Sequence, residues 1–323
     1  MFDTLVEKLK KDPKTIVFTE GPDARILEAT ARIKAEGIMK VVLVGNVAEV
    51  EAAAKKGGFD IEGVEIIDPE TYAEMDAMVA KMVELRKGKM TPEQCKANLL
   101  KGNYFGTMLV KMGKADCLLG GATYSTADTV RPALQLIKTK PGNSIVSSCF
   151  IMVRDKADGT QEKLAMGDCA INIHPTEDNL VEIAQETAKC AETFGIDPKV
   201  AFLSFSTKGS AKDDEVTKVQ NAVAKAKEVM TVPVDGEMQF DAAVAPEVGQ
   251  LKFPGSPVAG HANTFIFPDV TAGNIGYKIA ARLGGFAAYG PILLGLNAPI
   301  NDLSRGCNAD EVYKMAIITA GLA

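Results

Sequence analysis

The chain has 323 residues, of which 46% are apolar and 24% charged, and its formal net charge is −6. This length predicts two domains or one large α/β domain rather than a single small core. The negative charge and the absence of tryptophan argue against nucleic acid and anionic membrane as partners, and no segment reaches the ~20 apolar residues of a membrane span.

Short β-branched runs alternate with longer helical patterns along the chain. A helix is expected from about Ala24, with Asp23 as its N-cap, and others over 178–194, ended by Gly195, and over 274–283. Strands are expected at 15–20, 40–46, 117–121, 144–153, 199–205, 231–236, 264–269 and 290–296. This alternation predicts an α/β fold with largely parallel strands.

Two boundaries divide the predicted elements. The segment "KTKPGNS" (138–144) is the first, and the strand that follows it runs into a polar, hairpin-like turn at 154–163 that contains Asp-Gly. The second lies near 295, where the last predicted strand ends. The remaining tail, 296–323, is too short to fold alone and should pack on one of the domains.

Cysteine usage and the first residues indicate a cytoplasmic protein. The start "MFDTLVEKLKKDPK" is charged and amphipathic and lacks the apolar core of a signal peptide. The six cysteines are scattered without a CxxC pair, which fits neither a disulfide framework nor a zinc site.

Several catalytic signatures are missing from the sequence. It contains no GxGxxG, GxxxxGK[ST], HExxH or GxSxG, so nicotinamide, P-loop, zinc-protease and serine-hydrolase sites have no support. No carboxylate cluster for Mg²⁺ or Mn²⁺ stands out either. We therefore expect no metal site and no required cofactor.

Loops rich in small residues follow three of the predicted strands, at 120–132, 203–211 and 267–285. In the first of them, Ser125 and Thr126 precede Arg131, and hydroxyl and backbone N–H groups at a helix start bind phosphate well. The same pattern also fits a plain helix N-cap at Ser125 or Thr126. Together the loops predict a ligand cleft at the carboxyl ends of parallel strands.

Arginine is scarce in this chain, with only seven among the 36 basic residues. A guanidinium binds carboxylate or phosphate through two parallel hydrogen bonds, which a lysine cannot do. Each arginine outside a helix is therefore either an anion-binding candidate or half of a surface ion pair.

Long motifs carry a resemblance to a known family. The segments "FTEGPDARILEAT", "GGATYSTADTVRPALQ", "LSFSTKGSA", "DGEMQFDAA", "TAGNIGYK" and "NDLSRGC" resemble those of phosphate acetyltransferases, and the match covers essentially the whole chain. The family transfers acetyl reversibly between coenzyme A and inorganic phosphate. The resemblance thus implies coenzyme A, acetyl-CoA, phosphate and acetyl phosphate as partners, with coenzyme A a substrate rather than a cofactor.

The same resemblance implies a two-domain α/β architecture like that of isocitrate and isopropylmalate dehydrogenases, with the active site in an interdomain cleft. Domain I would combine 1–141 with 296–323, and domain II would span 142–295. A homodimer is expected, because the family usually forms one.

Individual site residues follow from the matching motifs. The resemblance places Ser304 and Arg305 at the acyl-transfer site, where a hydroxyl can bind the developing oxyanion and a guanidinium can neutralise phosphate or thiolate. It assigns Arg131 and Arg86 to substrate phosphate. From the residues alone, Arg86 looks like a helix-end cation among lysines.

The identity of the catalytic base is left open between two carboxylates. Asn308-Ala-Asp-Glu has the spacing of a capping box, which would give Glu311 a purely structural role and leave Asp310 near the helix dipole or facing the cleft. The family register, counted from Ser304, instead puts Glu311 at the position of the base. We favour Glu311 and keep Asp310 as the alternative.

Three other readings compete with phosphate acetyltransferase. A phosphate butyryltransferase shares the fold and much of the site, a metal-dependent dehydrogenase shares only the fold, and a catalytically silent acyl-CoA-binding homologue would need a degenerate site. The intact "LSRGC" segment argues against the last. We expect the coenzyme A thiolate to attack directly in a ternary complex, with Cys307 only a small packed residue.

Overall fold

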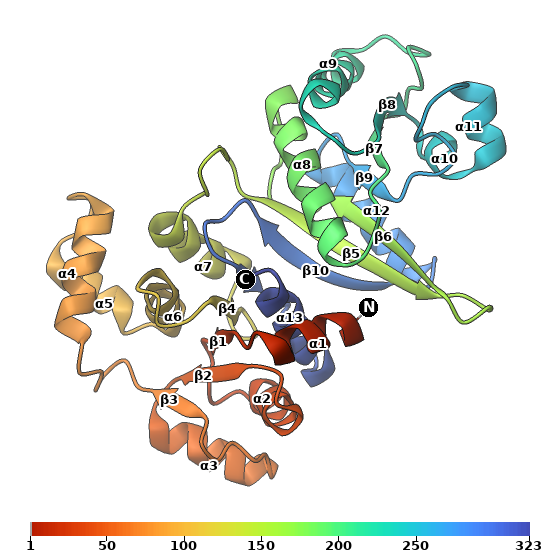
Figure 1. Cartoon of the computed structure of the whole chain (residues 1–323). Helices are drawn as coiled ribbons and strands as arrows, with labels where there is room; N and C mark the ends of the chain where they lie inside the picture. The colour runs from red at the N-terminus through yellow and green to blue at the C-terminus, as the bar shows by residue number, and fades with distance from the viewer. Residues whose placement is uncertain (1) are drawn as a thin grey trace. The chain divides into compact units, whose positions relative to one another are not determined.

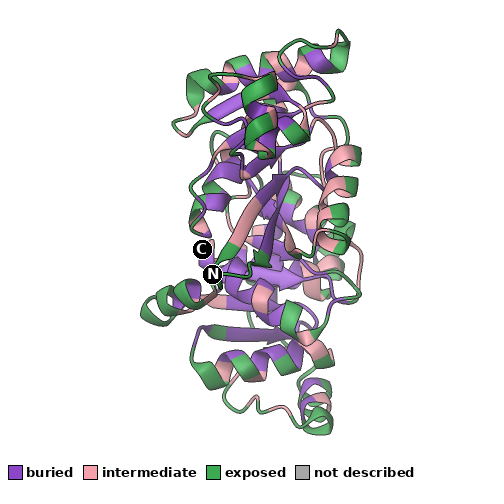
Figure 2. Ribbon diagram, turned by 90° about the vertical axis from the view of Figure 1, so that its right-hand side faces the viewer, coloured by how far each residue is buried: buried purple, intermediate pink, exposed green. Residues whose placement is uncertain are grey.

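The computed structural model describes residues 2–323, which form a mixed α/β fold with two sheets. The chain divides into two compact units, whose elements Figure 1 labels. Unit 1 comprises the chain up to Pro141 together with Leu296–Ala323, and unit 2 comprises Gly142–Gly295. Within each unit the strands are mostly buried, while the outward helix faces are exposed (Figure 2).

Unit 1 is built on a parallel sheet with the strand order β11-β4-β1-β2-β3. Its strands are β1 (Thr15–Phe18), β2 (Lys40–Val44), β3 (Glu65–Ile67), β4 (Cys117–Gly120) and β11 (Ile300–Asp302). Its helices are α1 (Phe2–Lys11), α2 (Ala24–Glu36), α3 (Val47–Gly57), α4 (Met75–Arg86), α5 (Pro92–Leu99), α6 (Gly102–Lys111), α7 (Thr126–Pro132), the π-turn η1 (Ala133–Ile137) and α13 (Ala309–Gly321). Because every strand of a parallel sheet points the same way, the loops after β1, β4 and β11 meet at one edge.

Local sequence signals position α2 as expected. The Asp23 carboxylate accepts a hydrogen bond from the Arg25 N–H at 2.9 Å, which caps the helix start. The helix ends at Gly37 in the left-handed conformation, with φ 61°. Between these signals, Ile26 and Ile33 are fully buried.

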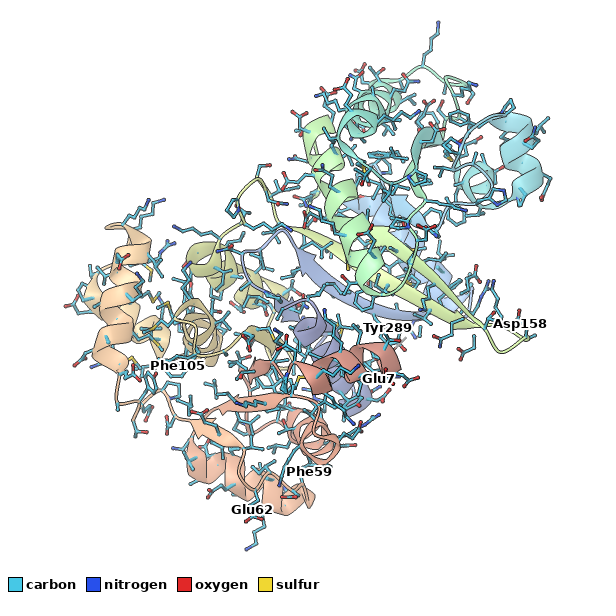
Figure 3. The ribbon with its side chains drawn as sticks, viewed as in Figure 1. Glu7, Phe59, Glu62, Phe105, Asp158 and Tyr289 are labelled. Atoms are coloured by element: carbon cyan, nitrogen blue, oxygen red, sulfur yellow. The ribbon has the colours of Figure 1, made fainter. Side chains whose placement is uncertain are left out.

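The C-terminal tail belongs to unit 1. Strand β11 pairs in parallel with β4, and α13 packs against α1 and α2. On the α4–α6 side of the sheet the core includes Phe105, which is fully buried and meets Tyr72 edge-on with ring centroids 5.1 Å apart (Figure 3).

Unit 2 has a mixed sheet with the order β10-β5-β6-β9-β7-β8. Its strands are β5 (Ser147–Asp155), β6 (Gln161–Gly167), β7 (Val200–Leu203), β8 (Val234–Met238), β9 (Thr264–Ile266) and β10 (Ala287–Leu294). Its helices are α8 (Glu177–Thr193), α9 (Asp214–Val229), α10 (Phe240–Val244), α11 (Pro246–Lys252) and α12 (Val270–Arg282). The pairs β10–β5 and β5–β6 are antiparallel and the other pairs are parallel.

The predicted polar turn is the tip of the β5–β6 hairpin, where Gly159 has φ 81° and Asp158 lies at the end of the projecting loop (Figure 3). The strands β3, β6 and β11 were not predicted from the sequence. β3 and β11 have three residues each, too short for an alternating pattern, so only their pairing with β2 and β4 defines them.

Helix α12 begins four residues before its expected start and buries a different face from the one its apolar spacing indicated. Gly273 and Tyr277 pack inward: a Cβ on Gly273 would lie 2.4 Å from the Asp168 carbonyl oxygen, and the Tyr277 ring stacks on Phe150 at 3.9 Å. The aligned residues Ile275, Ile279 and Leu283 are exposed instead. The stripe on α12 is therefore a surface feature and not part of the core of unit 2.

All six cysteines are free and buried. Within residues 2–323, no helix is both long enough and apolar enough to cross a lipid bilayer.

Candidate active site

The turn between β11 and α13 carries the candidate acyl-transfer residues. The Cys307 N–H donates to the Ser304 carbonyl oxygen at 2.9 Å, and the Gly306 N–H donates to Ser304 Oγ at 3.2 Å. Ser304 and Arg305 are exposed. Because Ser304 Oγ accepts within the turn, its own O–H can still donate to a substrate oxygen.

Arg305 presents an uncommitted charge at this turn. Among residues 2–323, its guanidinium has no hydrogen-bond or ion-pair partner. Its backbone is held, because the Arg305 carbonyl accepts a hydrogen bond from Arg25 Nη1 at 2.8 Å. A fixed backbone with a free guanidinium suits the capture of an anion.

Arg25 organises the turn, although sequence reasoning gave it no role. Its guanidinium donates to the Asp23 carboxylate at 2.7 and 2.9 Å, and its remaining N–H groups donate to the carbonyls of Arg305, Cys307 (3.2 Å) and Ala122 (2.8 Å). These contacts join the loops that follow β1, β4 and β11. The scarcity of arginine singled out Arg25 as one of only seven, but the carbonyl groups that it bonds are 97 to 282 residues away in sequence.

The two carboxylates of α13 have different environments. Glu311 closes the predicted capping box: its Oε2 accepts the Asn308 N–H at 3.0 Å, and its own N–H donates to Asn308 Oδ1 at 2.9 Å. Asp310 pairs with Lys314 Nζ at 2.6 Å and Arg32 Nη1 at 3.0 Å. The hydrogen bond from Lys314 lowers the pKa of Asp310, which makes Asp310 a poorer proton acceptor than an unpaired aspartate.

Cys307 is buried beside this turn, with its Sγ 3.7 Å from Arg25 Nη1. Burial raises the pKa of the Cys307 thiol, and Arg25 offsets only part of that rise. A catalytic cysteine requires the opposite, a thiolate with a lowered pKa. These observations favour a packing role for Cys307.

Helix α7 carries three of the candidate substrate-binding residues. Ser125 is its N-cap residue and donates to Asp128 Oδ2 at 2.7 Å, and Thr126 donates to Asp302 Oδ2 at 2.6 Å. Both hydroxyls are thus engaged within the protein. Arg131 is exposed, and its one ion pair among residues 2–323 is a long 3.8 Å contact with Asp128, so its guanidinium remains available for a ligand.

Arg86 lies at the end of α4, and its Nε is buried without a hydrogen-bond partner among the described residues. Burial raises the pKa of Tyr104, and the positive charges of Arg131 and Arg86 both oppose that rise. Arg86 is partly buried, unlike a fully solvated helix-end cation, and its charge acts on the same phenol as that of Arg131.

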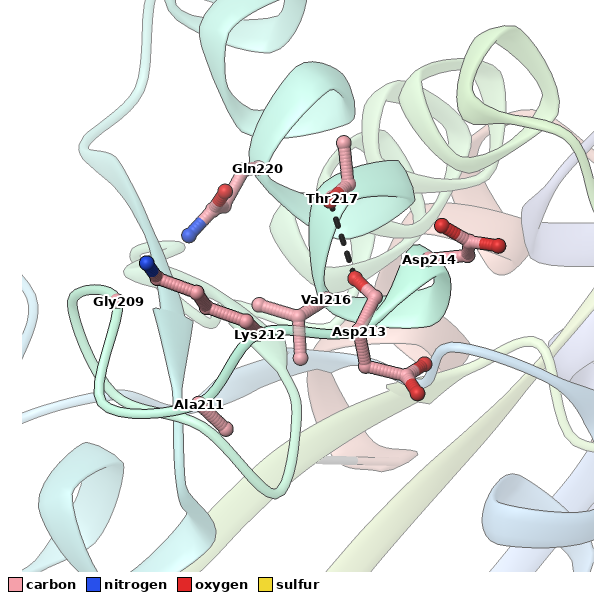
Figure 4. A pocket seen from close by; sticks show the side chains of 8 residues that line it. All are labelled: Gly209, Ala211, Lys212, Asp213, Asp214, Val216, Thr217 and Gln220. Carbon is pink, nitrogen blue, oxygen red and sulfur yellow. Dashed lines mark hydrogen bonds between the residues drawn. The ribbon is translucent and has the colours of Figure 1, made fainter.

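The loops of unit 2 that follow β7 and β9 carry no candidate catalytic side chain. The segment 203–211 folds on itself, with Glu237 Oε1 accepting from Ser206 Oγ at 2.8 Å and from the Gly209 N–H at 2.7 Å. A hollow of about 540 Å³ adjoins it at the start of α9, where the Thr217 hydroxyl donates to the Asp213 carbonyl at 3.0 Å (Figure 4). Gly209, Ala211, Lys212, Asp213, Asp214, Val216, Thr217 and Gln220 line this hollow.

Comparison with known proteins assigns the chain to a family. A family model described as phosphate acetyl/butaryl transferase matches residues 1–320. The chain belongs to this family.

Among the described residues 2–323, no group of three or more His, Cys, Asp and Glu side chains is placed to hold a metal ion.

Several members of the family are similar over the full length. The chain is 53% identical to a phosphate acetyltransferase of Bacillus subtilis (strain 168), covering 100% of this chain and 99% of that protein. A phosphotransacetylase structure from Streptococcus pyogenes is 52% identical with a TM-score of 0.95, and one from Staphylococcus aureus is 50% identical with a TM-score of 0.92. Each covers 99% of this chain and is itself 97% covered.

Proposed function

We propose that the protein is a phosphate acetyltransferase, which transfers acetyl reversibly between coenzyme A and inorganic phosphate. The observation that carries this proposal is the turn of Ser304 and Arg305, in a chain 53% identical over its whole length to a phosphate acetyltransferase. The turn presents an exposed hydroxyl and a guanidinium that has no partner among residues 2–323. We place coenzyme A among the substrates and include no cofactor.

The coenzyme A thiolate attacks the acetyl carbonyl of acetyl phosphate directly in a ternary complex. The C–S bond forms as the C–O bond to phosphate breaks, and the thiol proton passes to a carboxylate, for which we propose Glu311. The Ser304 hydroxyl donates to the carbonyl oxygen as negative charge develops there. Arg305 balances the charge of thiolate and phosphate, and Arg131 and Arg86 hold substrate phosphate.

The experiment that tests this function is a direct assay. Purified protein supplied with coenzyme A and acetyl phosphate should form acetyl-CoA, measured by thioester absorbance, without added metal or nucleotide. Faster turnover with butyryl phosphate would favour a butyryltransferase. Binding of acyl-CoA without turnover would indicate a silent homologue.

Arg131→Ala should weaken the binding of acetyl phosphate and phosphate more than that of coenzyme A, because the Arg131 guanidinium is exposed and only loosely paired. Arg131→Lys should restore part of the loss, since a point charge lacks the two parallel donors. Steady-state kinetics with each substrate varied in turn measures this. Equal effects on the two substrates would remove Arg131 from the acetyl phosphate subsite.

We propose that the protein is a homodimer and that the outer face of α12 contributes to its interface. Ile275, Ile279 and Leu283 recur every four residues and are 54%, 53% and 85% exposed. Single exposed apolar residues are ordinary, whereas apolar residues gathered into one exposed patch are typical of an interaction surface. In finer detail, we propose a fold like that of isocitrate and isopropylmalate dehydrogenases. The division of the chain into two α/β units supports this proposal.

Ile279→Glu should shift the protein toward monomer, because it places a charge in the middle of the stripe. Light scattering after size exclusion measures the mass of each species. Val229→Glu is the matched control, since Val229 is 54% exposed, close to the 53% of Ile279, but belongs to a different helix. A wild-type monomer, or an Ile279→Glu protein with unchanged mass, would contradict this interface.

We further propose a cytoplasmic location. All six cysteines are free, as is usual in a reducing compartment, and the proposed substrates are intracellular metabolites.

A further inference from the structure

A buried carboxylate links the acyl-transfer turn to α7. Asp302, the last residue of β11, is 2% exposed, and two residues after it comes Ser304. Its Oδ2 accepts from Thr126 Oγ1 at 2.6 Å and its Oδ1 accepts from Thr129 Oγ1 at 2.5 Å. Both hydroxyls belong to α7, the helix that carries Arg131.

The surroundings of Asp302 hold its carboxylate in place. Gly121 lies directly over it with φ 98°, and a Cβ at that position would approach Asp302 Oδ1 to 2.2 Å. The Leu303 N–H donates to the Gly120 carbonyl at 2.7 Å, which keeps the end of β11 close to the end of β4. The carboxylate therefore cannot move without displacing the loop that leads into α7.

A second buried carboxylate holds the same loop from the other side. Glu20 follows β1 and is 9% exposed. Its Oε1 accepts from the N–H groups of Gly121 at 3.1 Å and Thr123 at 3.0 Å, and its Oε2 accepts from Thr19 Oγ1 at 2.8 Å. Because β4 lies between β11 and β1 in the sheet, the segment after β4 is bonded to a carboxylate from each neighbouring strand.

Stability alone is a weak reason for this arrangement. Among residues 2–323, neither Asp302 nor Glu20 has a cation within ion-pair distance, and burial raises the pKa of both carboxyl groups. A buried charge without a counter-ion costs stability even when hydrogen bonds satisfy it. What a carboxylate adds is two or more directional acceptors that fix a geometry.

We propose that Asp302, with Glu20 on the opposite side, is a positioning residue that sets α7, and with it Arg131, relative to Ser304 and Arg305. This inference rests on the proposed function for the roles of those three residues. It assigns no substrate contact to Asp302 itself. Its effect on the reaction passes entirely through Arg131.

The test compares Asp302→Asn and Thr129→Val with Arg131→Ala. Asp302→Asn and Thr129→Val should each raise the KM of the substrate that Arg131→Ala affects, by roughly 10-fold, with a smaller change in the KM of the other substrate. Adding Asp302→Asn to Arg131→Ala should change that KM little further, because residues acting through one element are not additive. Equal changes for both substrates, or additive changes in the double variant, would overturn the proposal.

Two controls separate positioning from general destabilisation. Asp68→Asn removes another carboxylate with two hydrogen-bond donors, Asn46 Nδ2 and the Glu70 N–H at 2.9 Å each, after β3 at the far edge of the same sheet. It should lower the melting temperature without changing either KM. If Asp302→Asn fails to fold, Thr129→Val decides the question, because it keeps the carboxylate and removes one of its donors.

Calorimetric titration with coenzyme A and with inorganic phosphate gives a readout that does not depend on turnover. If wild-type protein binds these ligands but transfers no acetyl group, the proposed function fails. The positioning inference is then tested separately by the affinities of the variants for coenzyme A and phosphate. If Asp302→Asn and Thr129→Val bind both ligands as wild type does, the positioning inference fails while the function stands.

Discussion

Glu311→Gln is expected to lower turnover by roughly 10²–10⁴-fold, the usual contribution of a general base, with little change in melting temperature. Glutamine serves at the third position of a capping box as well as glutamate does. The hydrogen bond from the Asn308 N–H to the Glu311 side chain can therefore persist in the variant while the basic group is removed. Steady-state turnover and thermal unfolding of the same preparation measure the two effects.

Proton transfer from the coenzyme A thiol to a carboxylate is energetically unfavourable in water. A free thiol has a pKa of roughly 8.5 and a carboxylate one of roughly 4, so an aqueous carboxylate is a poor base for coenzyme A. The Arg305 guanidinium nearby can stabilise the thiolate and narrow that gap. Two cations beside a carboxylate would increase this pKa difference. Asp310 is in that situation, because it pairs with Lys314 and Arg32.

Asp310→Asn is the matched control, since it removes a charge one residue away on the same helix. It should keep near-normal turnover and lose less than about 1 kcal/mol of stability, because its ion pairs are exposed. A large kinetic loss in Asp310→Asn, with near-normal Glu311→Gln, would make Asp310 the base. Near-normal turnover in both variants would remove the carboxylate base from α13 altogether.

The parts of the site that the sequence revealed are those encoded by neighbouring residues. The capping box of Asn308 and Glu311 could be seen from its spacing and is present in the structure. The Asp23 cap and the Asp-Gly tip of the β5–β6 hairpin were likewise local signals. In each case a side chain bonds a backbone group a few residues away, and the sequence pattern contains both partners.

The parts that were missed depend on partners far away in the chain. Arg25, Glu20 and Asp302 bond to groups 97 to 282 residues distant, and no spacing rule marks such pairs. The prediction of which face of α12 is buried was wrong for a related reason. Its apolar period predicted a helix correctly, but Gly273 lets the opposite face approach the sheet more closely than any side chain would, which leaves Ile275 and Ile279 outside.

Arg305→Ala is expected to lower turnover by roughly 10²–10³-fold, the loss seen when one preorganised partner of a developing charge is removed. The guanidinium has no partner among residues 2–323, so its removal breaks no contact within the described protein, and the melting temperature should stay close to wild type. The turn itself should survive, because Arg25 Nη1 bonds the carbonyl of residue 305 and not its side chain. Turnover and thermal unfolding measured together separate these two effects.

Arg305→Lys should recover only part of the activity, since an ammonium supplies charge without the planar pair of donors. Added guanidinium ion should partly rescue Arg305→Ala and leave Ser304→Ala unaffected, because only the former leaves a space of that shape beside an intact hydroxyl. Turnover of Arg305→Ala close to wild type would show that the charge of thiolate and phosphate is balanced elsewhere. Arg131 and Arg86 would then be the remaining exposed or partly buried arginines of unit 1 able to do so, since Asp23 and backbone carbonyls occupy Arg25, and Asp310 and Glu36 occupy Arg32.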